Sequence, residues 1–356
     1  MLLIVLGLIG VGLVQVYSSS FIFAIESHGD GLFFFKKQLL FAALSIPVML
    51  GVALVPWRNF ERWGFLLWLA SFVLILATFV PGLSHKAGGA ARWVNLGPFK
   101  FEPAELLKLS LPFVFGTFLC LDTGRLGIWR WPVFAAVIGA PMGLLLLQPD
   151  FGSVVISSAV LLTLLFYFGL KWRYIIASMI VLVPAFYFMV VMVPYRRARL
   201  LAFMDPWSDP GKGGFQVIQS LLSLYSGGLW GAGLGQGQGK LFFLPEAHTD
   251  FTLAVLGEEM GFAGVGFIIF LYSFLIFRGF QIAARSQSVF AQAVALGLTV
   301  TFAFQVVINM GVVMGLLPTK GLTLPFLSYG GSSLLMSALM FGILLNIGRY
   351  VPTKSR

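Results

Sequence analysis

Long apolar segments separated by short polar loops run through almost the whole chain. A helix needs about 20 consecutive apolar residues to cross the hydrocarbon core of a bilayer. Ten segments approach this length, and they are Met1–Ser18, Gln38–Val55, Trp63–Val80, Ala104–Leu121, Trp131–Gln148, Ser153–Leu170, Tyr174–Val193, Phe251–Phe277, Val289–Leu316 and Ser332–Gly348. The pattern predicts an all-α, polytopic membrane protein with ten transmembrane helices. The first segment is expected to be retained, because it lacks a signal-peptide pattern, and the long ninth could be tilted or broken.

Composition supports this prediction. Hydrophobic residues make up 59% of the 356 residues and charged residues only 10%, whereas soluble domains carry about 25% charged residues. No polar stretch could form a separate soluble domain, so residues 1–356 are expected to be a single integral membrane domain. The net charge of +10 lies on scattered loop residues, which favours membrane lipid headgroups over nucleic acid as partners. The lone Cys120 excludes a disulfide framework.

The distribution of Lys and Arg predicts the orientation. Five short loops (56–62, 122–130, 171–173, 278–288 and 349–356) hold 11 of these cations in 38 residues, whereas the other loops spread 11 over more than 110 residues. Cytoplasmic loops are the ones enriched in Lys and Arg, so both termini are expected to be cytoplasmic. Eleven of the 13 carboxylates lie in, or at the membrane mouth of, the opposite loops. Any chemistry is therefore expected to face outward.

The connection between the seventh and eighth spans, residues 194–250, is the longest polar segment. Its many aromatic and apolar residues predict an ordered extracytoplasmic loop, with Phe215–Tyr225 as an amphipathic helix at the membrane interface. The glycine-rich run Gly231–Gly239 suggests a phosphate cradle, but it fits neither G-x-G-x-x-G nor the P-loop pattern. A flexible or tightly turned loop is the favoured interpretation.

Carboxylates gather where this loop ends, since four of the 13 lie within Glu246–Glu259. Asp250 comes just before the eighth span. It is either the N-cap of that helix or a catalytic group. Glu258 and Glu259 follow about 12–14 Å further along the helix, and they could simply pack against arginine or backbone donors.

Other charged residues also allow two interpretations. Glu105 and Lys108 share a helix face, either as a functional pair inside the bilayer or as a structural ion pair. Asp150 precedes a helix and could be its N-cap. A basic cluster outside the seventh span consists of Arg196, Arg197 and Arg199. It could bind lipid headgroups, or it could clamp a lipid-linked diphosphate, whose oxygens match guanidinium geometry.

Six motifs in order along the chain resemble a known family. They are Gly89–Gly97, Glu102–Lys108, Gln148–Gly152, Pro245–Phe251, Gly257–Glu259 and Leu324–Ser333. Together they resemble the SEDS family, which comprises FtsW, RodA and SpoVE. Two further stretches, Ala202–Trp207 and Leu317–Thr323, resemble the division-type FtsW more than the elongation-type RodA.

The resemblance implies a peptidoglycan glycosyltransferase that polymerises lipid II into glycan strands, in cell division or elongation, with a class B penicillin-binding protein transpeptidase as partner. It implies a bacterial inner (cytoplasmic) membrane location and an inverting reaction, with Asp250 as the catalytic base. Substrate or diphosphate contacts are expected at Arg92, Trp93, Glu105, Lys108, Asp150, Arg196, Arg197 and His248, supported by Glu258, Glu259 and Ser328. A divalent cation, Mg²⁺ or Mn²⁺, is expected with Asp150 as its candidate contact, and no organic cofactor is expected.

Two other functions remain open on the sequence alone. One is a lipid II flippase or transporter, which would need polar groups at every depth of the membrane, whereas the acids here crowd the outer mouth. The other is a non-catalytic scaffold for a transpeptidase, which would leave the acids of the outer loop replaceable.

Overall fold

The computed structural model describes residues 1–56, 59–87, 90–97, 99–121, 129–169, 171–173, 176, 180, 187, 192–208, 210–211, 214–240 and 244–350. Its long helices are α1 (Leu2–His28), α2 (Phe33–Leu54), α3 (Asn59–Ala77), α4 (Pro103–Cys120), α6 (Arg130–Leu147), α7 (Phe151–Tyr167), α11 (Thr252–Arg285), α12 (Val289–Val313) and α13 (Gly331–Arg349). Within the described residues, seven of these helices are long and apolar enough to cross a membrane, and α6 and α7 are shorter apolar helices. Nine expected spans thus fall on helices. The expected seventh, Tyr174–Val193, lies almost wholly outside the described residues.

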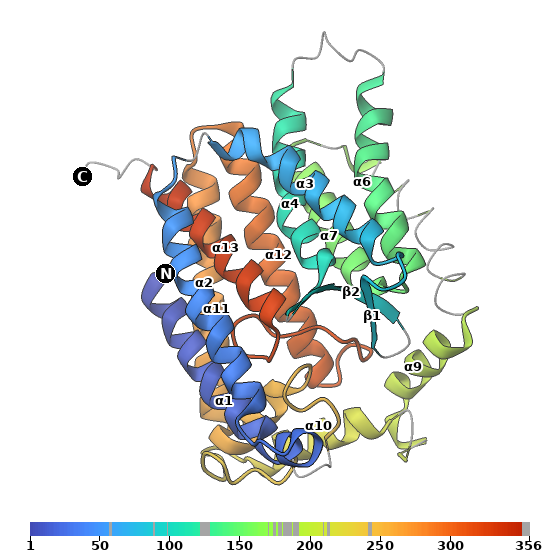
Figure 1. Cartoon of the computed structure of the whole chain (residues 1–356), viewed down its shortest axis with the longest axis vertical. Coiled ribbons are helices and arrows are strands. Elements are labelled where there is room, and N and C mark those ends of the chain that lie inside the picture. The colour runs from blue at the N-terminus through green and yellow to red at the C-terminus, as the bar shows by residue number, and fades with distance from the viewer. Residues whose placement is uncertain are drawn as a thin grey trace.

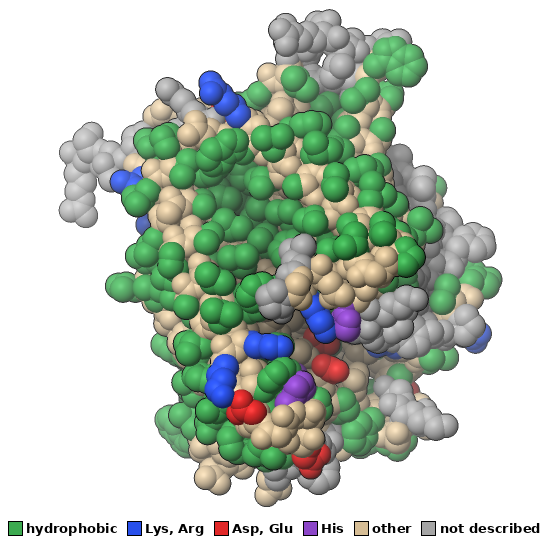
Figure 2. Space-filling view, in the orientation of Figure 1, with side chains coloured by type: hydrophobic (Ala, Val, Ile, Leu, Met, Phe, Trp, Pro, Cys, Tyr) green, Lys and Arg blue, Asp and Glu red, His purple; other side chains and the backbone are tan. Residues whose placement is uncertain are grey.

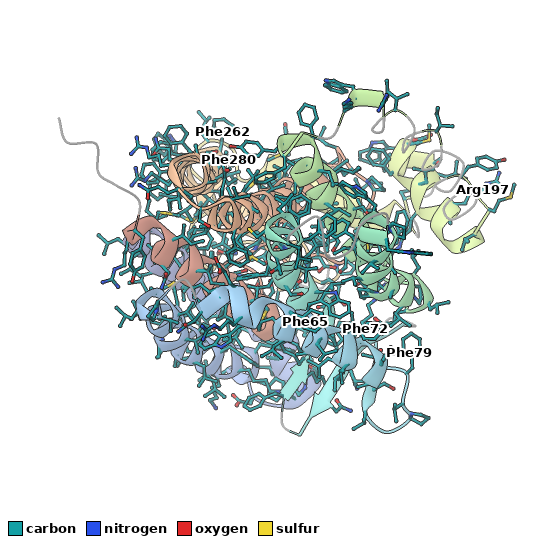
Figure 3. All side chains as sticks on the ribbon, turned by 90° about the horizontal axis from the view of Figure 1, so that it is seen from above. Phe65, Phe72, Phe79, Arg197, Phe262 and Phe280 are labelled. Carbon is teal, nitrogen blue, oxygen red and sulfur yellow. The ribbon has the colours of Figure 1, made fainter. Side chains whose placement is uncertain are left out.

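The bundle is built around α12, which packs against α4, α7, α11 and α13. Figure 1 shows α1, α2, α11 and α13 on one side of it and α3, α4, α6 and α7 on the other. The faces turned away from the core carry large apolar side chains. Phe65, Phe262 and Phe280 are 52%, 72% and 40% exposed, and Phe262 lies at the edge of the molecule in the view from above in Figure 3. Apolar side chains turned outward on a helical bundle are what a lipid environment requires.

The outer loops are ordered where they are described, as expected for residues 194–250. They form α9 (Pro194–Met204), a short 3-10 helix η3 (Pro206–Ser208) and α10 (Phe215–Ser226). The predicted amphipathic helix is therefore confirmed as α10, which buries Val217, Ile218, Ser220 and Ser223 on one face. Figure 1 shows α9 standing apart from the bundle.

A small antiparallel sheet was not predicted by the sequence analysis. It consists of β1 (Ser84–Ala87), β2 (Ala90–Leu96) and β3 (Phe99–Phe101) in the order β1-β2-β3. Trp93 of β2 pairs with His85, and Asn95 pairs with Lys100. The strands are too short to show a clear alternation of polar and apolar residues. Strand β2, which carries Arg92, packs against α3 and α4.

The long ninth span is a single helix, α12, and the interruption falls instead in the eighth. Helix α11 is interrupted at Gly261, where φ is 66° and ψ is −170°. Only glycine adopts such a backbone conformation readily. The interruption separates a short outer segment, Thr252–Met260, from the longer inner part of α11.

Candidate functional site

Asp250 lies in a tight turn that ends at the start of α11. The backbone N–H groups of Thr249, Asp250 and Phe251 all donate to the carbonyl of Glu246, at 3.1, 3.2 and 3.3 Å. This turn makes Phe251 the N-cap, and α11 starts at Thr252. The alternative role of Asp250 as helix N-cap is therefore wrong, and its carboxylate is available for another purpose.

The surroundings of Asp250 change its acidity. Burial, followed by the negative charge of Glu246, raises the pKa of the Asp250 carboxyl from 3.8 to about 7, while Arg199 and Arg92 oppose the rise. Next to it, a Cβ added at Gly321 would lie 3.2 Å from Asp250 Oδ2, so the carboxylate faces the loop after α12. A carboxyl group with a pKa near 7 can accept a proton efficiently at neutral pH.

The Glu105–Lys108 pair predicted from sequence is confirmed. Lys108 Nζ lies 2.5 Å from Glu105 Oε1, and both side chains are buried. Gln305 Nε2 donates to Glu105 Oε2 at 3.2 Å. One helical turn further along α12, Asn309 Nδ2 donates to the carbonyl of Asp250 at 3.0 Å. Helix α12 thereby connects the buried ion pair to the turn that carries Asp250.

Arg92 and Asp150 are close to the outer end of α4. Arg92 Nη2 donates to the carbonyl of Pro149 at 2.8 Å. Asp150 is the N-cap of α7, as one interpretation predicted, and its Oδ1 accepts from the N–H of Ser153 at 3.4 Å. Its second oxygen, Oδ2, is buried and has no hydrogen-bond partner among the described residues. An unpartnered buried oxygen of this kind could take a cation or a substrate hydroxyl.

Glu102 is a site residue that the sequence analysis missed. Burial raises the pKa of Glu102 to about 8. The negative charges of Glu105 and Asp150 add to this rise, and Lys108 and Arg92 oppose it. These electrostatic interactions place the five side chains in one neighbourhood. Its position one residue before α4, inside the motif Glu102–Lys108, was the available signal.

Lys320 is a second residue that was missed. It lies in the loop after α12, with Nζ 4.8 Å from the centre of the Phe151 ring. Burial lowers the pKa of Lys320, and the charge of Asp150 opposes this. The single lysine within Leu317–Thr323, a stretch that resembles FtsW, was the available signal.

The basic cluster on α9 is divided by the structure. Arg197 is exposed and lies at the outer edge of α9 (Figure 3). Arg199 Nη1 donates to the carbonyl of Thr319 at 3.4 Å, and its charge acts on Asp250. The side chain of Arg196 lies outside the described residues. Arg199 is thus the described member of the cluster that reaches the site, and the diphosphate role of Arg196 and Arg197 stays a prediction.

The remaining predicted residues lie around the site. His248 packs among the rings of Phe23, Phe34 and Tyr329, and burial lowers its pKa. Ser328 is buried, and its Oγ accepts from the N–H of Leu324 at 2.9 Å. In these positions both residues support the turns around Asp250.

Glu258 and Glu259 lie further along the outer segment of α11. Glu258 accepts hydrogen bonds from backbone N–H groups of the glycine-rich run, and Glu259 pairs with Lys240. Packing against backbone donors, one of the sequence interpretations, is confirmed for Glu258. The glycine-rich run is a turned loop, as favoured, and it surrounds a carboxylate of this chain.

Figure 2 shows how these groups reach the surface. Acidic, basic and histidine side chains gather around a hollow in the lower half of the view, whereas the upper half shows mainly hydrophobic side chains and few charged ones. Within the described residues, no group of three or more His, Cys, Asp or Glu could hold a metal ion. The arrangement places the Asp250 carboxyl under the influence of nearby cations at one end of an apolar bundle.

A helical bundle with apolar helices long enough to cross a membrane and a charged site at one end defines this protein as a polytopic membrane protein. The chain belongs to the FtsW/RodA/SpoVE family of cell cycle proteins, whose profile matches residues 1–352. It is 42% identical to a "Probable peptidoglycan glycosyltransferase FtsW" of Geobacter sp. (strain M18), over 94% of this chain and 92% of the relative. It is 36% identical to "Stage V sporulation protein E" of Bacillus subtilis (strain 168), over 98% of this chain and 96% of the relative.

Two solved structures share the fold. One is described as "Structural coordination of polymerization and crosslinking by a peptidoglycan synthase complex", with a TM-score of 0.78, 29% identity and coverage of 98% of this chain and 96% of that chain. The other is the rod shape determining protein RodA of Thermus thermophilus, with a TM-score of 0.70, 26% identity and coverage of 99% and 96%. The greater similarity to FtsW than to RodA, expected from sequence, is confirmed.

Proposed function

We propose that this protein is a peptidoglycan glycosyltransferase that polymerises lipid II at the outer leaflet of a bacterial inner membrane. Relatives named as probable peptidoglycan glycosyltransferases support the reaction class. The single observation that carries the proposal is the Asp250 carboxyl. This carboxyl group does not cap α11. Its pKa is about 7, and the positive charges of Arg199 and Arg92 act on it.

In this proposal the acceptor sugar hydroxyl loses its proton to Asp250 as it attacks the anomeric carbon of the donor. The bond from that carbon to the diphosphate oxygen breaks, and the carbon is inverted once. No covalent intermediate with the protein is needed. A base with a pKa near the working pH combines a useful ionised fraction with sufficient basicity.

The leaving diphosphate gains negative charge in the transition state, so the site must supply positive charge. Lys108, Arg92 and Arg196 or Arg197 are the cations predicted from sequence. The structure adds Arg199, whose charge acts on Asp250, and Lys320, which lies near Phe151 and Asp150. Lys108 is held by Glu105 at 2.5 Å. Cations that are already in place when charge develops stabilise it without the cost of reorganisation.

A divalent cation is proposed to bind together with the substrate. Mg²⁺ and Mn²⁺ prefer oxygen ligands and often use one or two carboxylates plus substrate phosphates. Asp150 Oδ2, buried and without a hydrogen-bond partner, is the fitting protein oxygen. The described residues provide no complete ligand set of their own, so the substrate would have to complete the coordination. When bound, such a cation would neutralise part of the diphosphate charge.

The location and partner are proposed on the same basis. The Lys and Arg distribution supports cytoplasmic termini, with the hollow of Figure 2 on the outer side. One structural neighbour was solved as part of a peptidoglycan synthase complex, which supports a class B penicillin-binding protein transpeptidase as partner.

Purified protein mixed with lipid II, followed by gel separation of glycan polymers, tests the proposal. We expect polymer with the natural sequence and none with Asp250→Asn. Flipping of fluorescent lipid II in liposomes tests the transporter alternative. Transport without polymer would replace the proposal, and neither activity would favour the scaffold.

A further inference from the structure

The interruption of α11 is closed by a second segment of the chain, residues 227–240, which we call the clasp loop. The N–H groups of Ala232 and Gly233 donate to the carbonyls of Glu258 and Glu259 at 2.9 and 3.1 Å. In the opposite direction, the N–H groups beyond the interruption donate to the clasp loop, Phe262 to Gly228 at 2.9 Å and Ala263 to Leu229 at 3.1 Å. Backbone groups that the interrupted helix cannot pair are thus paired by the clasp loop.

The two backbones approach so closely that side chains cannot fit between them. A Cβ added at Gly261 would lie 2.4 Å from the nitrogen of Gly231, and a Cβ at Gly231 would lie 2.2 Å from the carbonyl oxygen of Glu259. Side chains on both segments reinforce this contact. Glu258 accepts from the N–H groups of Gln238 at 2.6 Å and of Gly239 at 3.0 Å.

A buried ion pair completes the contact. Lys240 Nζ lies 2.7 Å from Glu259 Oε1, and their side chains are only 6% and 0% exposed. Lys240 also donates to the carbonyl of Gly235 at 2.7 Å and to Ser18 Oγ of α1 at 2.9 Å. Ser18 Oγ in turn donates to Glu259 at 2.5 Å. Three segments therefore meet at a single lysine.

The outer segment Thr252–Met260 is consequently held at two ends. At the Asp250 end, Asn309 of α12 donates to the carbonyl of Asp250 at 3.0 Å. At the other end, the clasp loop and Lys240 hold Glu258 and Glu259. Because the interruption at Gly261 separates this segment from the rest of α11, the inner helix alone does not fix its direction. The clasp contacts must supply the second fixed point.

We propose that Lys240 is a positioning residue, which sets the direction of the segment 252–260 and thereby the place of the Asp250 carboxylate in the site. The kinetic part of this inference rests on the proposed function, and the geometric part does not. Removing the ion pair is expected to leave Asp250 chemically intact but displaced. A displacement of about 1 Å can reduce turnover by about two orders of magnitude.

The experiment measures geometry and turnover in the same full-length protein in nanodiscs. Cys120 is replaced by serine, and spin labels are attached through Thr249→Cys, beside Asp250, and Val307→Cys, on the exposed face of α12. The distance distribution between the labels is then recorded for the parent and for Lys240→Met. Lys36→Met is the matched control. It removes an outer lysine from an ion pair of similar length, Lys36–Asp30 at 2.8 Å, whose side chains are 62% and 44% exposed.

We expect Lys240→Met to shift or broaden the distance distribution, and Lys36→Met to leave it unchanged. In lipid II polymerisation we expect kcat to fall at least about tenfold in Lys240→Met, with KM within about twofold of the parent. If Lys240→Met does not fold because Glu259 is left buried and unpaired, the double variant Lys240→Met with Glu259→Met replaces it in both measurements.

An unchanged distance distribution overturns the proposal, and so does an unchanged kcat in a variant whose distribution has shifted. A fall in kcat without any change in distance also overturns it, because Lys240 would then act by another route. If the parent makes no polymer while the distribution shifts in Lys240→Met, the proposed function fails and the geometric role of Lys240 stands.

Discussion

Replacing Asp250 by asparagine should make the protein more stable at alkaline pH while it removes the activity. The pKa of the Asp250 carboxyl is raised from 3.8 to about 7, chiefly by burial. An acid whose pKa is higher in the folded protein favours folding while it is protonated, and that contribution is lost as the pH rises through the folded-state pKa. Above about pH 7, the fold therefore carries the full cost of an ionised, half-buried carboxylate.

The size of this cost follows from the pKa change. Each pKa unit corresponds to about 1.4 kcal/mol, so a rise from 3.8 to about 7 gives an upper limit of about 4 kcal/mol. Because Asp250 keeps some contact with solvent, we expect about half of that. Asparagine has nearly the same shape and no charge, so Asp250→Asn should recover this energy at pH 8. At pH 4, where wild-type Asp250 is mostly protonated, it should recover almost none.

The assay is thermal unfolding in nanodiscs, followed by the loss of monodisperse protein, for wild type and Asp250→Asn at pH 4 and pH 8. We expect the variant to unfold several degrees higher than wild type at pH 8 and within about one degree of it at pH 4. An equal difference at both pH values, or a less stable variant at pH 8, would refute the argument that burial holds this carboxyl at a raised pKa. Lys36→Met serves as the control, since its exposed ion pair should contribute little.

Three further predictions concern the cations and the pH dependence. With Asp250 as base, the polymerisation rate should rise about tenfold between pH 6 and pH 8, and Arg199→Met should move the midpoint to higher pH by removing an opposing positive charge; a flat profile would contradict this. Lys108→Met should destabilise the fold by about 3–5 kcal/mol because Glu105 is left buried and unpaired. Combining Lys108→Met with Glu105→Gln should restore the unfolding temperature, but gels should still show no glycan polymer. If polymer returned, Lys108 would have no role in stabilising the diphosphate. EDTA should stop polymerisation and Mg²⁺ or Mn²⁺ should restore it, with Asp150→Asn requiring more metal; activity in EDTA would exclude the cation.

The sequence was sufficient for nine of the ten expected spans, which fall on helices among the described residues, and for the Glu105–Lys108 pair. Both depend on local spacing, because a span needs a long apolar run and a helical pair needs a separation of three or four residues. The sequence was not sufficient for contacts between distant segments. Lys240 and Glu259 meet beside the interruption at Gly261 in α11, a helix whose apolar pattern continues on both sides of that glycine. Nothing in the spacing of residues 227–240 indicates that these glycines face another backbone.

The role of Asp250 shows a different limit. An acid immediately before a helix is most simply interpreted as its N-cap, and the rule holds for Asp150 at α7. It fails at Asp250, because the left-handed conformation of Glu246, with φ of 57°, closes a turn that moves the helix start to Thr252. The cap position is then occupied by Phe251. The same local pattern thus produced a structural acid in one motif and a free one in the other.

The net charge of the site could not be predicted from the sequence either. Its cations are Arg92, Lys108, Arg199 and Lys320, and its carboxyls are those of Glu102, Glu105, Asp150, Asp250 and Glu246, whose charge acts on Asp250. If all were ionised, the five carboxylates would outnumber the four cations and an anionic diphosphate would be repelled. Burial raises the pKa of Glu102 to about 8 and that of Asp250 to about 7. At pH 7 the first therefore mostly holds a proton and the second does so about half of the time, which leaves the site positive. The burial that raises the pKa of Asp250 into the range of an effective base therefore also gives the site the positive net charge that an anionic substrate requires.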